Sequence, residues 1–456
     1  MARDQIDMTP LQSRDELIAW LEAGVKPPSE FRIGTEHEKT PFTLQGHQPV
    51  PYEGDRGIGA LLEGMKLLLG WEPIIECGNI IGLYDVTGGG AISLEPGGQF
   101  ELSGAPVETV HQTQSELTAH LAQVREVATP LGIGFLGLGV TPSWSRKQIP
   151  VMPKGRYKIM TAYMPKVGQH GLDMMYRTCT VQTNLDFSSE ADMVKKLRVS
   201  LALQPIATAL FANSPFTEGK PNGFLSFRSE IWRDTDNARS GMLPWAFEHG
   251  MGFERWVDYA LDVPMYFVKR GDSYIDVSGT SFRDFFDGRH PMFPGERPTL
   301  SDWANHLSTI FPEVRLKRYL EMRGADGGPW ERIPALSAFW VGLLYDNASL
   351  DAAWDIARSW SAHERQALRD DVPRLGFKAK IRDRHLFEIA KECLILARAG
   401  LRRRGRLDRF GRDESRHLDP LDRIIDSGRT PAEEMLEEFN GPWGGSVEPA
   451  YEEYAF

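Results

Sequence analysis

The segment from Ile33 to Phe42 constrains the fold more than any other part of the sequence, because it carries Glu36 and Glu38 two residues apart. Side chains alternate faces along a strand, so in an extended segment both glutamates lie on one face and His37 lies on the other. At roughly 3.3 Å per residue the two acidic residues stand about 6–7 Å apart. Bare carboxylates at that spacing repel each other and raise each other's pKa. The segment therefore predicts a strand whose acidic face grips a cation or is open to solvent.

Three later segments repeat the alternation of polar and apolar residues. In residues 92–103 a Pro-Gly-Gly turn places Glu95 at the end of one strand and Glu101 on the next. Residues 177–187 line one face with polar side chains, among them Gln182, and residues 223–232 alternate in the same way around Arg228. An antiparallel sheet with one solvated face would show the same alternation. The concentration of negative charge, however, favours a divalent-metal site.

The candidate metal ligands all bind through oxygen. Hard oxygen ligands select Mg²⁺, Mn²⁺ or Ca²⁺ rather than zinc or copper, and Mg²⁺ typically shares its site with substrate phosphates. Arginines near an acidic bowl add recognition of carboxylates through paired hydrogen bonds. The pattern therefore favours a site for a nucleotide phosphate chain and a carboxylate substrate. The candidate ligands are Glu36, Glu38, Glu95, Glu101 and Gln182, and the arginines are Arg156, Arg228 and Arg239.

Composition sets the outer limits. The 456 residues are 41% hydrophobic and 25% charged, as in an ordinary globular protein, and the net charge of −11 argues against nucleic acid or an anionic membrane as a partner. The start of the chain has no apolar signal-peptide core, and no apolar run approaches the roughly 20 residues of a membrane span. Cys77, Cys179 and Cys393 are too few for a disulfide framework. We therefore expect a reducing, cytoplasmic location.

The chain reads as one domain, 1–456, with a sheet-rich core at about 30–300 and a mostly helical part at 301–456. A match to the dinucleotide fingerprint at Gly132, Gly134 and Gly137 is rejected, because it follows a helix and opens a strand, the reverse of the required order. His37 and Cys179 face the apolar side of their strands, so we expect packing roles for both. Periodicity predicts helices at 9–24, 57–69, 107–130, 190–213, 301–311, 315–323, 335–346, 351–370, 383–404 and 431–439.

Several long motifs closely resemble the glutamate–cysteine ligases of the plant and proteobacterial type. They are residues 33–42, Leu94 to Glu101, Arg177 to Phe187, Ala212 to Trp232, Tyr319 to Trp330 and Asn440 to Gly444. The resemblance runs from about residue 30 to the C-terminus. It implies an α+β fold similar to the catalytic half of glutamine synthetase, in which helices wrap a curved antiparallel sheet and the concave face holds the active site.

The resemblance also implies a reaction and a set of roles. ATP would phosphorylate the γ-carboxylate of L-glutamate, and L-cysteine would attack the acyl phosphate to give γ-glutamylcysteine, the first step of glutathione biosynthesis. Glu36, Glu38, Glu95, Glu101 and Gln182 resemble ligands of Mg²⁺, with Mn²⁺ as the substitute, and Glu38 and Arg228 would be catalytic. Arg156 and Arg228 resemble a glutamate clamp, Tyr266 and Trp232 substrate contacts, and Arg239 a nucleotide contact. The protein would be a monomer or a homodimer.

Three other interpretations stay open on the residues alone. The first is a carboxylate–amine ligase of the same fold that uses a different amine acceptor, since the acceptor pocket is the part least defined by motifs. The second is a glycosidase that uses two of the carboxylates and needs no nucleotide. The third is a divalent-ion binding module without catalysis.

Overall fold

The computed structural model describes residues 7–456 and is built around one nine-stranded sheet in the order β14-β15-β7-β1-β5-β4-β3-β2, with β6 added beside β1. Every pairing in this sheet is antiparallel. Its strands are β1 (Ile33–Thr43), β2 (Glu72–Glu76), β3 (Asn79–Tyr84), β4 (Ala91–Leu94), β5 (Phe100–Ser103), β6 (Ile133–Leu136), β7 (Thr180–Leu185), β14 (Val314–Leu316) and β15 (Leu320–Asp326). The expected α+β fold with a large antiparallel sheet is confirmed.

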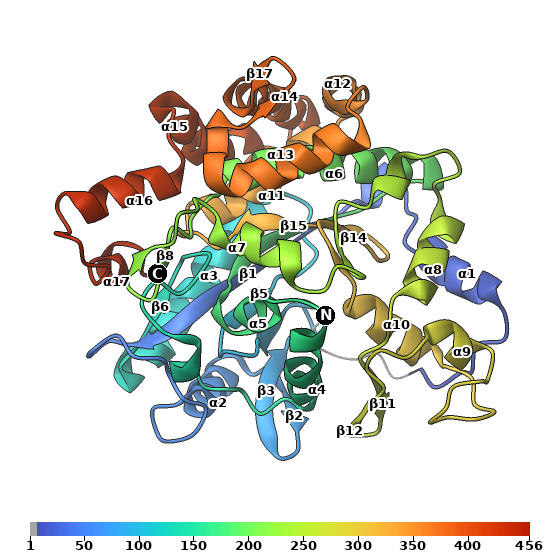
Figure 1. The fold of residues 1–456 in the computed structure, drawn as a ribbon. Helices are drawn as coiled ribbons and strands as arrows, with labels where there is room; N and C mark the ends of the chain where they lie inside the picture. Colours follow the sequence, from blue (N-terminus) through green and yellow to red (C-terminus); the bar gives the residue numbers. More distant parts are fainter. Residues whose placement is uncertain (1–6) are drawn as a thin grey trace.

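Helices cover one face of this sheet, and several have no solvated side. The helix α11 (Arg332–Leu344) is buried from Ile333 to Leu344, and α6 (Glu190–Leu210) is buried throughout from Val199 to Leu210. A helix that is apolar on all sides belongs inside a core, which explains why the chain folds around these two. Pro205 lies within α6. In Figure 1 the C-terminal helices gather on one side of the sheet.

The remaining elements complete the walls around the sheet (Figure 1). Short two-stranded pairs are formed by β8 (Phe216–Thr217) with β9 (Lys220–Pro221), β10 (Ser240–Gly241) with β13 (Phe311–Pro312), β11 (Phe267–Arg270) with β12 (Ser273–Asp276), and β16 (Lys380–Ile381) with β17 (Arg384–His385). The other helices are α1 (Arg14–Glu22), α2 (Ile58–Leu69), α3 (Val110–Ala128), α4 (Gly155–Tyr163), α5 (Gly171–Arg177), α7 (Phe227–Ile231), α8 (Phe253–Asp262), α9 (Phe282–Phe286), α10 (Leu300–Ser308), α12 (Asn347–Ala357), α13 (Ala362–Leu375), α14 (Leu386–Arg404), α15 (Asp419–Ser427), α16 (Pro431–Asn440) and α17 (Ala450–Glu453). Within residues 7–456, none of the helices combines the length and the apolar character that a bilayer crossing requires.

Two predicted elements are wrong. Residues 315–323 do not form a helix but the hairpin of β14 and β15. Their alternation of Val314 and Leu316 with Arg315 and Lys317 has the two-residue period of a strand, and the charged members are buried against Glu321 rather than exposed. Residues 223–232 do not form a strand either, because the Ser226 side chain accepts a hydrogen bond from the Ser229 N–H and starts α7.

Other differences concern boundaries and missed helices. The single helix expected at 351–370 is two helices, α12 and α13, because Ser361 and Glu364 form a capping box that begins α13. The helices α4, α5 and α8 lie outside the ranges for which periodicity predicted helices. The strand that follows Gly132 is β6.

Helices α11 and α14 approach each other closely at two glycines. A Cβ atom built on Gly342 would overlap the carbonyl oxygen of Ala397, and one on Gly400 would overlap the carbonyl oxygen of Gly342. We predict that Gly342→Ala lowers the free energy of unfolding by about 1–3 kcal/mol, because overpacking forces two buried helices apart. Urea denaturation measures the change. Gly90→Ala is the control, since its Cβ would meet nothing nearer than 3.6 Å; equal losses in both variants would contradict the helix-contact explanation.

Candidate active site

The face of the sheet opposite α3 and α11 forms the floor of a cavity of about 340 Å³. Strands β1, β5, β7, β14 and β15 supply this floor. The walls come from the β2–β3 and β11–β12 hairpins, from α4 and α5, from α7, and from α10. Of the ten residues predicted for the site, eight line this cavity: Glu36, Glu38, Glu95, Glu101, Arg156, Gln182, Arg228 and Trp232.

The four glutamates come together because of strand register. Glu38 on β1 pairs directly with Glu101 on β5, and Glu95 follows β4 at the turn that leads into β5. Burial raises the pKa of Glu38 well above its ordinary value, and the neighbouring Glu95 and Glu101 add to this. Burial also raises the pKa values of Glu36 and Glu101. The cavity floor therefore carries like charges that favour either protons or a bound cation.

Hydrogen bonds hold the glutamates in place. The Thr180 N–H donates to Glu38 Oε2 at 2.9 Å, the Asn184 amide to Glu36 Oε1 at 2.8 Å, and the Ser103 hydroxyl to Glu101 Oε1 at 2.6 Å. Each carboxylate keeps further lone pairs directed elsewhere, since an ionised carboxylate offers about four acceptor positions. Within the described residues, 7–456, no three His, Cys, Asp or Glu side chains stand close enough to share one metal ion as they are.

Gln182 is oriented by a different partner. It pairs with Glu36 across β1 and β7, as a shared site would require, but its side-chain oxygen accepts a hydrogen bond from Arg323 Nη1 at 2.6 Å. That oxygen is the atom a metal would bind, so its predicted role as a ligand stays a prediction.

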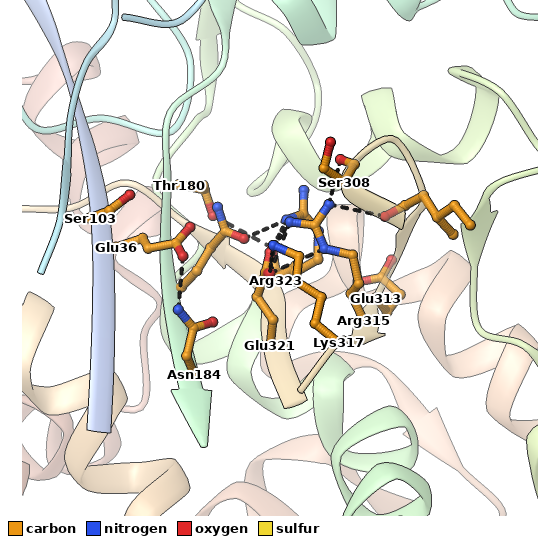
Figure 2. Close-up of polar contacts among 12 residues, drawn as sticks. Glu36, Ser103, Thr180, Asn184, Ser308, Glu313, Arg315, Lys317, Glu321 and Arg323 are labelled. Atoms are coloured by element: carbon orange, nitrogen blue, oxygen red, sulfur yellow. Dashed lines mark hydrogen bonds and ion pairs between the residues drawn. The ribbon is translucent and has the colours of Figure 1, made fainter. Parts of the chain in front are cut away.

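A cluster of buried positive charge stands beside the glutamates, and Figure 2 shows how it is held. The Glu321 carboxylate, fully buried on β15, accepts from Arg315 at 2.7 Å, from Lys317 at 3.1 Å and from Arg323. These three cations lower the pKa of Glu321 well below its ordinary value, although burial opposes them. Three positive charges against one negative leave this part of the cavity wall cationic. These residues were not predicted from the sequence, because a helix was expected at 315–323; the alternation from Val314 to Lys317 was the available signal.

A second cationic region lies across the cavity on α4 and the residue before it. Arg156 lines the cavity, and its guanidinium lies over the Tyr157 ring at 5.3 Å. Lys154, which the sequence analysis did not single out as a site residue, is buried beside it. Burial lowers the pKa of Lys154 to about 8, helped by the neighbouring Arg156 and opposed by Glu95 and Glu101. A buried lysine whose charge is only partly offset by nearby carboxylates can bind an anion in the cavity.

Arg228 reaches the cavity from α7, where its side chain is buried and its Nη2 donates to the Arg323 carbonyl at 3.0 Å. Trp232 lines the same wall one helical turn further on. Arg239 and Tyr266, in contrast, are not brought to the cavity. Arg239 is fully buried, lies 3.7 Å over the Tyr266 ring and bonds to Asp236, Thr309 and Pro264, while the Tyr266 hydroxyl donates to Asp236.

Two aromatic residues near Tyr266 in the fold do line the cavity wall. Phe267, the residue after Tyr266, and Tyr274 belong to the β11–β12 hairpin and line the cavity. The packing roles expected for His37 and Cys179 are confirmed. His37 is buried against the His120 ring at 5.5 Å, and burial lowers its pKa well below the ordinary value. Cys179 is fully buried, and burial raises the pKa of its thiol.

Comparison with solved structures places this fold among those of the glutamate–cysteine ligases. The chain is similar to the glutamate–cysteine ligase of Francisella tularensis, solved in complex with AMP, with a TM-score of 0.51 and 14% identity over 90% of this chain and 85% of that one. At this identity the likeness shows the fold alone.

Sequence comparison then shows the family. The family model "Glutamate-cysteine ligase family 2 (GCS2)" matches residues 32–453, and the chain belongs to this family. It is 58% identical over 444 residues to the chloroplastic glutamate–cysteine ligase of Nicotiana tabacum, covering 97% of this chain and 83% of that protein. It is 56% identical over 453 residues to the chloroplastic ligase B of Oryza sativa subsp. japonica, covering 99% and 89%. The resemblance stated from the motifs is confirmed.

The expected cytoplasmic location is contradicted by these relatives. The similar proteins from Nicotiana tabacum, Arabidopsis thaliana, Solanum lycopersicum and Oryza sativa are all named as chloroplastic. The argument from cysteine content concerned only the redox state of the compartment, and a reducing environment does not distinguish the cytosol from an organelle.

The raised pKa of Glu38 yields a prediction about stability. Between the ordinary value of 4.5 and its raised pKa, the folded state keeps a proton that the unfolded state loses, so the free energy of unfolding falls as pH rises through this window. Glu38→Gln removes the titrating group and with it this loss of stability. We expect the free energy of unfolding of the ligand-free variant to exceed that of the original protein by about 0.5–2 kcal/mol at about pH 7.5, and by less at about pH 5.

Urea denaturation at the two pH values measures this difference in the absence of divalent cations. Glu296→Gln, an exposed position, is the matched control and should show no gain at either pH. A Glu38→Gln variant that is less stable at the higher pH would contradict the proposed repulsion.

Proposed function

We propose that this chain catalyses the ATP-dependent ligation of L-glutamate to L-cysteine, giving γ-glutamylcysteine, the first step of glutathione biosynthesis. The observation that carries the proposal is the family match over residues 32–453, which spans all the residues that line the cavity floor. The cavity supports it, because it brings carboxylates and cationic side chains to the same space.

The chemistry explains why both signs of charge are needed. A carboxylate is a poor electrophile, and an amine cannot displace an oxide, so the γ-carboxylate must first receive a phosphoryl group as a leaving group. Bringing ATP beside a carboxylate places two anions together, and positioned cations offset the charge that develops in the transition state. Holding the two reacting partners in line supplies a further part of the barrier, about 7–11 kcal/mol in favourable cases.

The donor chemistry of the floor fits a divalent cation with a preference for oxygen. Glu36, Glu38, Glu95 and Glu101 would hold Mg²⁺, or Mn²⁺ in its place, because a cation would stabilise these mutually repelling carboxylates, of which Glu36 and Glu101 are buried. Bound there, the cation would neutralise phosphate charge. The proposed catalytic importance of Glu38 rests on its pairing with Glu101 and on the repulsion from Glu95 and Glu101 that raises its pKa.

The cationic side chains divide naturally between the two substrates. Arg156 and Arg228 would bind the carboxylates of glutamate, because a guanidinium forms two parallel hydrogen bonds with a carboxylate. Lys317, Arg323 and Lys154 would face the phosphates of ATP, since they line the cavity beside the glutamates. Trp232 would form part of the substrate wall. The roles predicted for Arg239 and Tyr266 stay predictions, and both residues lie outside the cavity lining.

An assay of ADP release tests the proposal directly. The purified protein is given ATP, Mg²⁺ and glutamate with cysteine, then with 2-aminobutyrate, then with no acceptor. ADP formation that depends on both glutamate and cysteine supports the proposal. Release with another amine but not with cysteine would instead support a ligase with a different acceptor. Metal binding without any ADP, or sugar hydrolysis without ATP, would favour the binding module or the glycosidase.

The two-point clamp of Arg228 gives a second measurable expectation. Arg228→Lys keeps the charge but loses the paired donors, so the glutamate KM should rise or kcat should fall, by about tenfold. Steady-state kinetics with glutamate varied at saturating ATP and cysteine measure this. Arg358→Lys, at an exposed arginine that pairs with Asp355, is the control. Normal constants in Arg228→Lys would mean that Arg228 does not bind glutamate.

A further inference from the structure

The carboxylate of Asp326 sits where three segments of the chain meet, outside the cavity lining. Asp326 ends β15 and is 1% exposed. The Asn213 N–H donates to its Oδ2 at 2.9 Å, the Ser214 hydroxyl to the same oxygen at 2.6 Å, and the Ser226 hydroxyl to Oδ1 at 2.7 Å. Both oxygens of one carboxylate thus connect the end of the sheet with the turn after α6 and with the start of α7.

The same two serines also hold the backbone of α7. The Ser214 hydroxyl accepts from the Arg228 N–H at 3.2 Å, and the Ser226 hydroxyl accepts from the Ser229 N–H at 3.2 Å as the N-cap. A hydroxyl that donates to a carboxylate can still accept a hydrogen bond, so each serine links Asp326 to the backbone of α7. Two hydrogen bonds, through Ser214, connect Asp326 with Arg228, the arginine that faces the cavity.

The other side of Arg228 is held by β15 itself. Its Nη2 donates to the carbonyl of Arg323, three residues before Asp326. The charge of Asp326 also favours the protonated guanidinium, although burial lowers the Arg228 pKa. Glu38 and Glu313 act in the same direction as Asp326, and Arg323 opposes them. The backbone of Arg228, through Ser214, and its side chain, through the Arg323 carbonyl, are therefore both held by the C-terminal residues of β15.

We propose that Asp326 is a positioning residue for Arg228: its buried carboxylate fixes α7 against the end of β15 and so aims the guanidinium into the cavity. The proposal rests on the proposed function, since its readout is glutamate binding. A five-residue helix such as α7 cannot hold its own direction, because isolated helices of this length are unstable in water. Something outside the helix must fix it, and Asp326 is the shared acceptor.

The test is a double-mutant cycle on the glutamate KM. Asp326→Asn keeps the shape but replaces one acceptor oxygen with a donor. In one orientation of the amide the Ser226 hydroxyl loses its acceptor, and in the other both the Asn213 N–H and the Ser214 hydroxyl lose theirs. We expect the glutamate KM to rise about tenfold in Asp326→Asn, and by less than about twofold when Asp326→Asn is added to Arg228→Lys, because coupled residues are not additive. The ATP KM should change by less than about twofold in both backgrounds.

Two further variants separate positioning from stability. Glu414→Gln alters a fully buried carboxylate that joins Val110 and Arg404 away from the cavity, and it should lower stability without changing the glutamate KM. Ser226→Ala removes one step of the network with less disturbance, and it should reproduce the glutamate effect if Asp326→Asn does not fold.

The outcomes are distinct. Equal effects of Asp326→Asn in both backgrounds, or a normal glutamate KM in a folded Asp326→Asn or Ser226→Ala variant, would overturn the inference while leaving the proposed function intact. An original protein that releases no ADP with glutamate and cysteine would instead overturn the proposed function.

Discussion

The central constraint in this structure is the burial of several carboxylates of like charge on one sheet face. Register leaves little choice in the matter: once β1 pairs with β5 and β7, Glu38 stands opposite Glu101, and Glu36 stands opposite Gln182. Desolvation and mutual repulsion both disfavour the charged forms, as the raised pKa values of Glu36, Glu38 and Glu101 show. A fold that keeps these groups together at a cost in stability is what the proposed binding of a positively charged ligand at this face would require.

The repulsion among the glutamates is confined to one face of the sheet. The opposite face of β1 carries His37 and Lys39, both buried, and packs against α3, so the acidic residues are confined to one side. Glu321, on the neighbouring β15, is also buried but is compensated by three cations, and its pKa moves the other way. The protein thus neutralises one buried carboxylate and leaves Glu36, Glu38 and Glu101 without such compensation. That contrast between neighbouring strands supports the proposal that the uncompensated carboxylates bind a cation.

Most of the acidic site could be predicted from the sequence, because it depends on a two-residue period and one turn. Glu36 and Glu38 on a single strand, and Glu95 and Glu101 around Pro-Gly-Gly, are local patterns. The cationic side was harder, because Arg315, Lys317 and Arg323 look like a solvated helix until Glu321 is known to neutralise them from within the sheet. Arg228 was predicted at the site, but on a strand. The segment instead forms the helix α7, which begins at the N-cap Ser226. In the sequence Arg239 cannot be told from an arginine that binds a ligand. The structure shows that its guanidinium already donates to Asp236 and to the Pro264 carbonyl and lies over the Tyr266 ring.

A small irregularity in β15 connects these separate features. The register of β15 against β7 shifts between Met322 and Ala325, so the strand bulges at Arg323 and Gly324. Bulges turn a side chain away from the regular alternation and are common beside active sites. A Cβ on Gly324 would overlap the side chain of Gln204 on α6, which leaves the bulge room only for glycine. Through this bulge Arg323 reaches Gln182 and Glu321 with its guanidinium while its carbonyl accepts from Arg228. The acidic floor, the cationic wall and the helix that carries Arg228 are therefore joined at a single residue, Arg323, which lies in the bulge of β15.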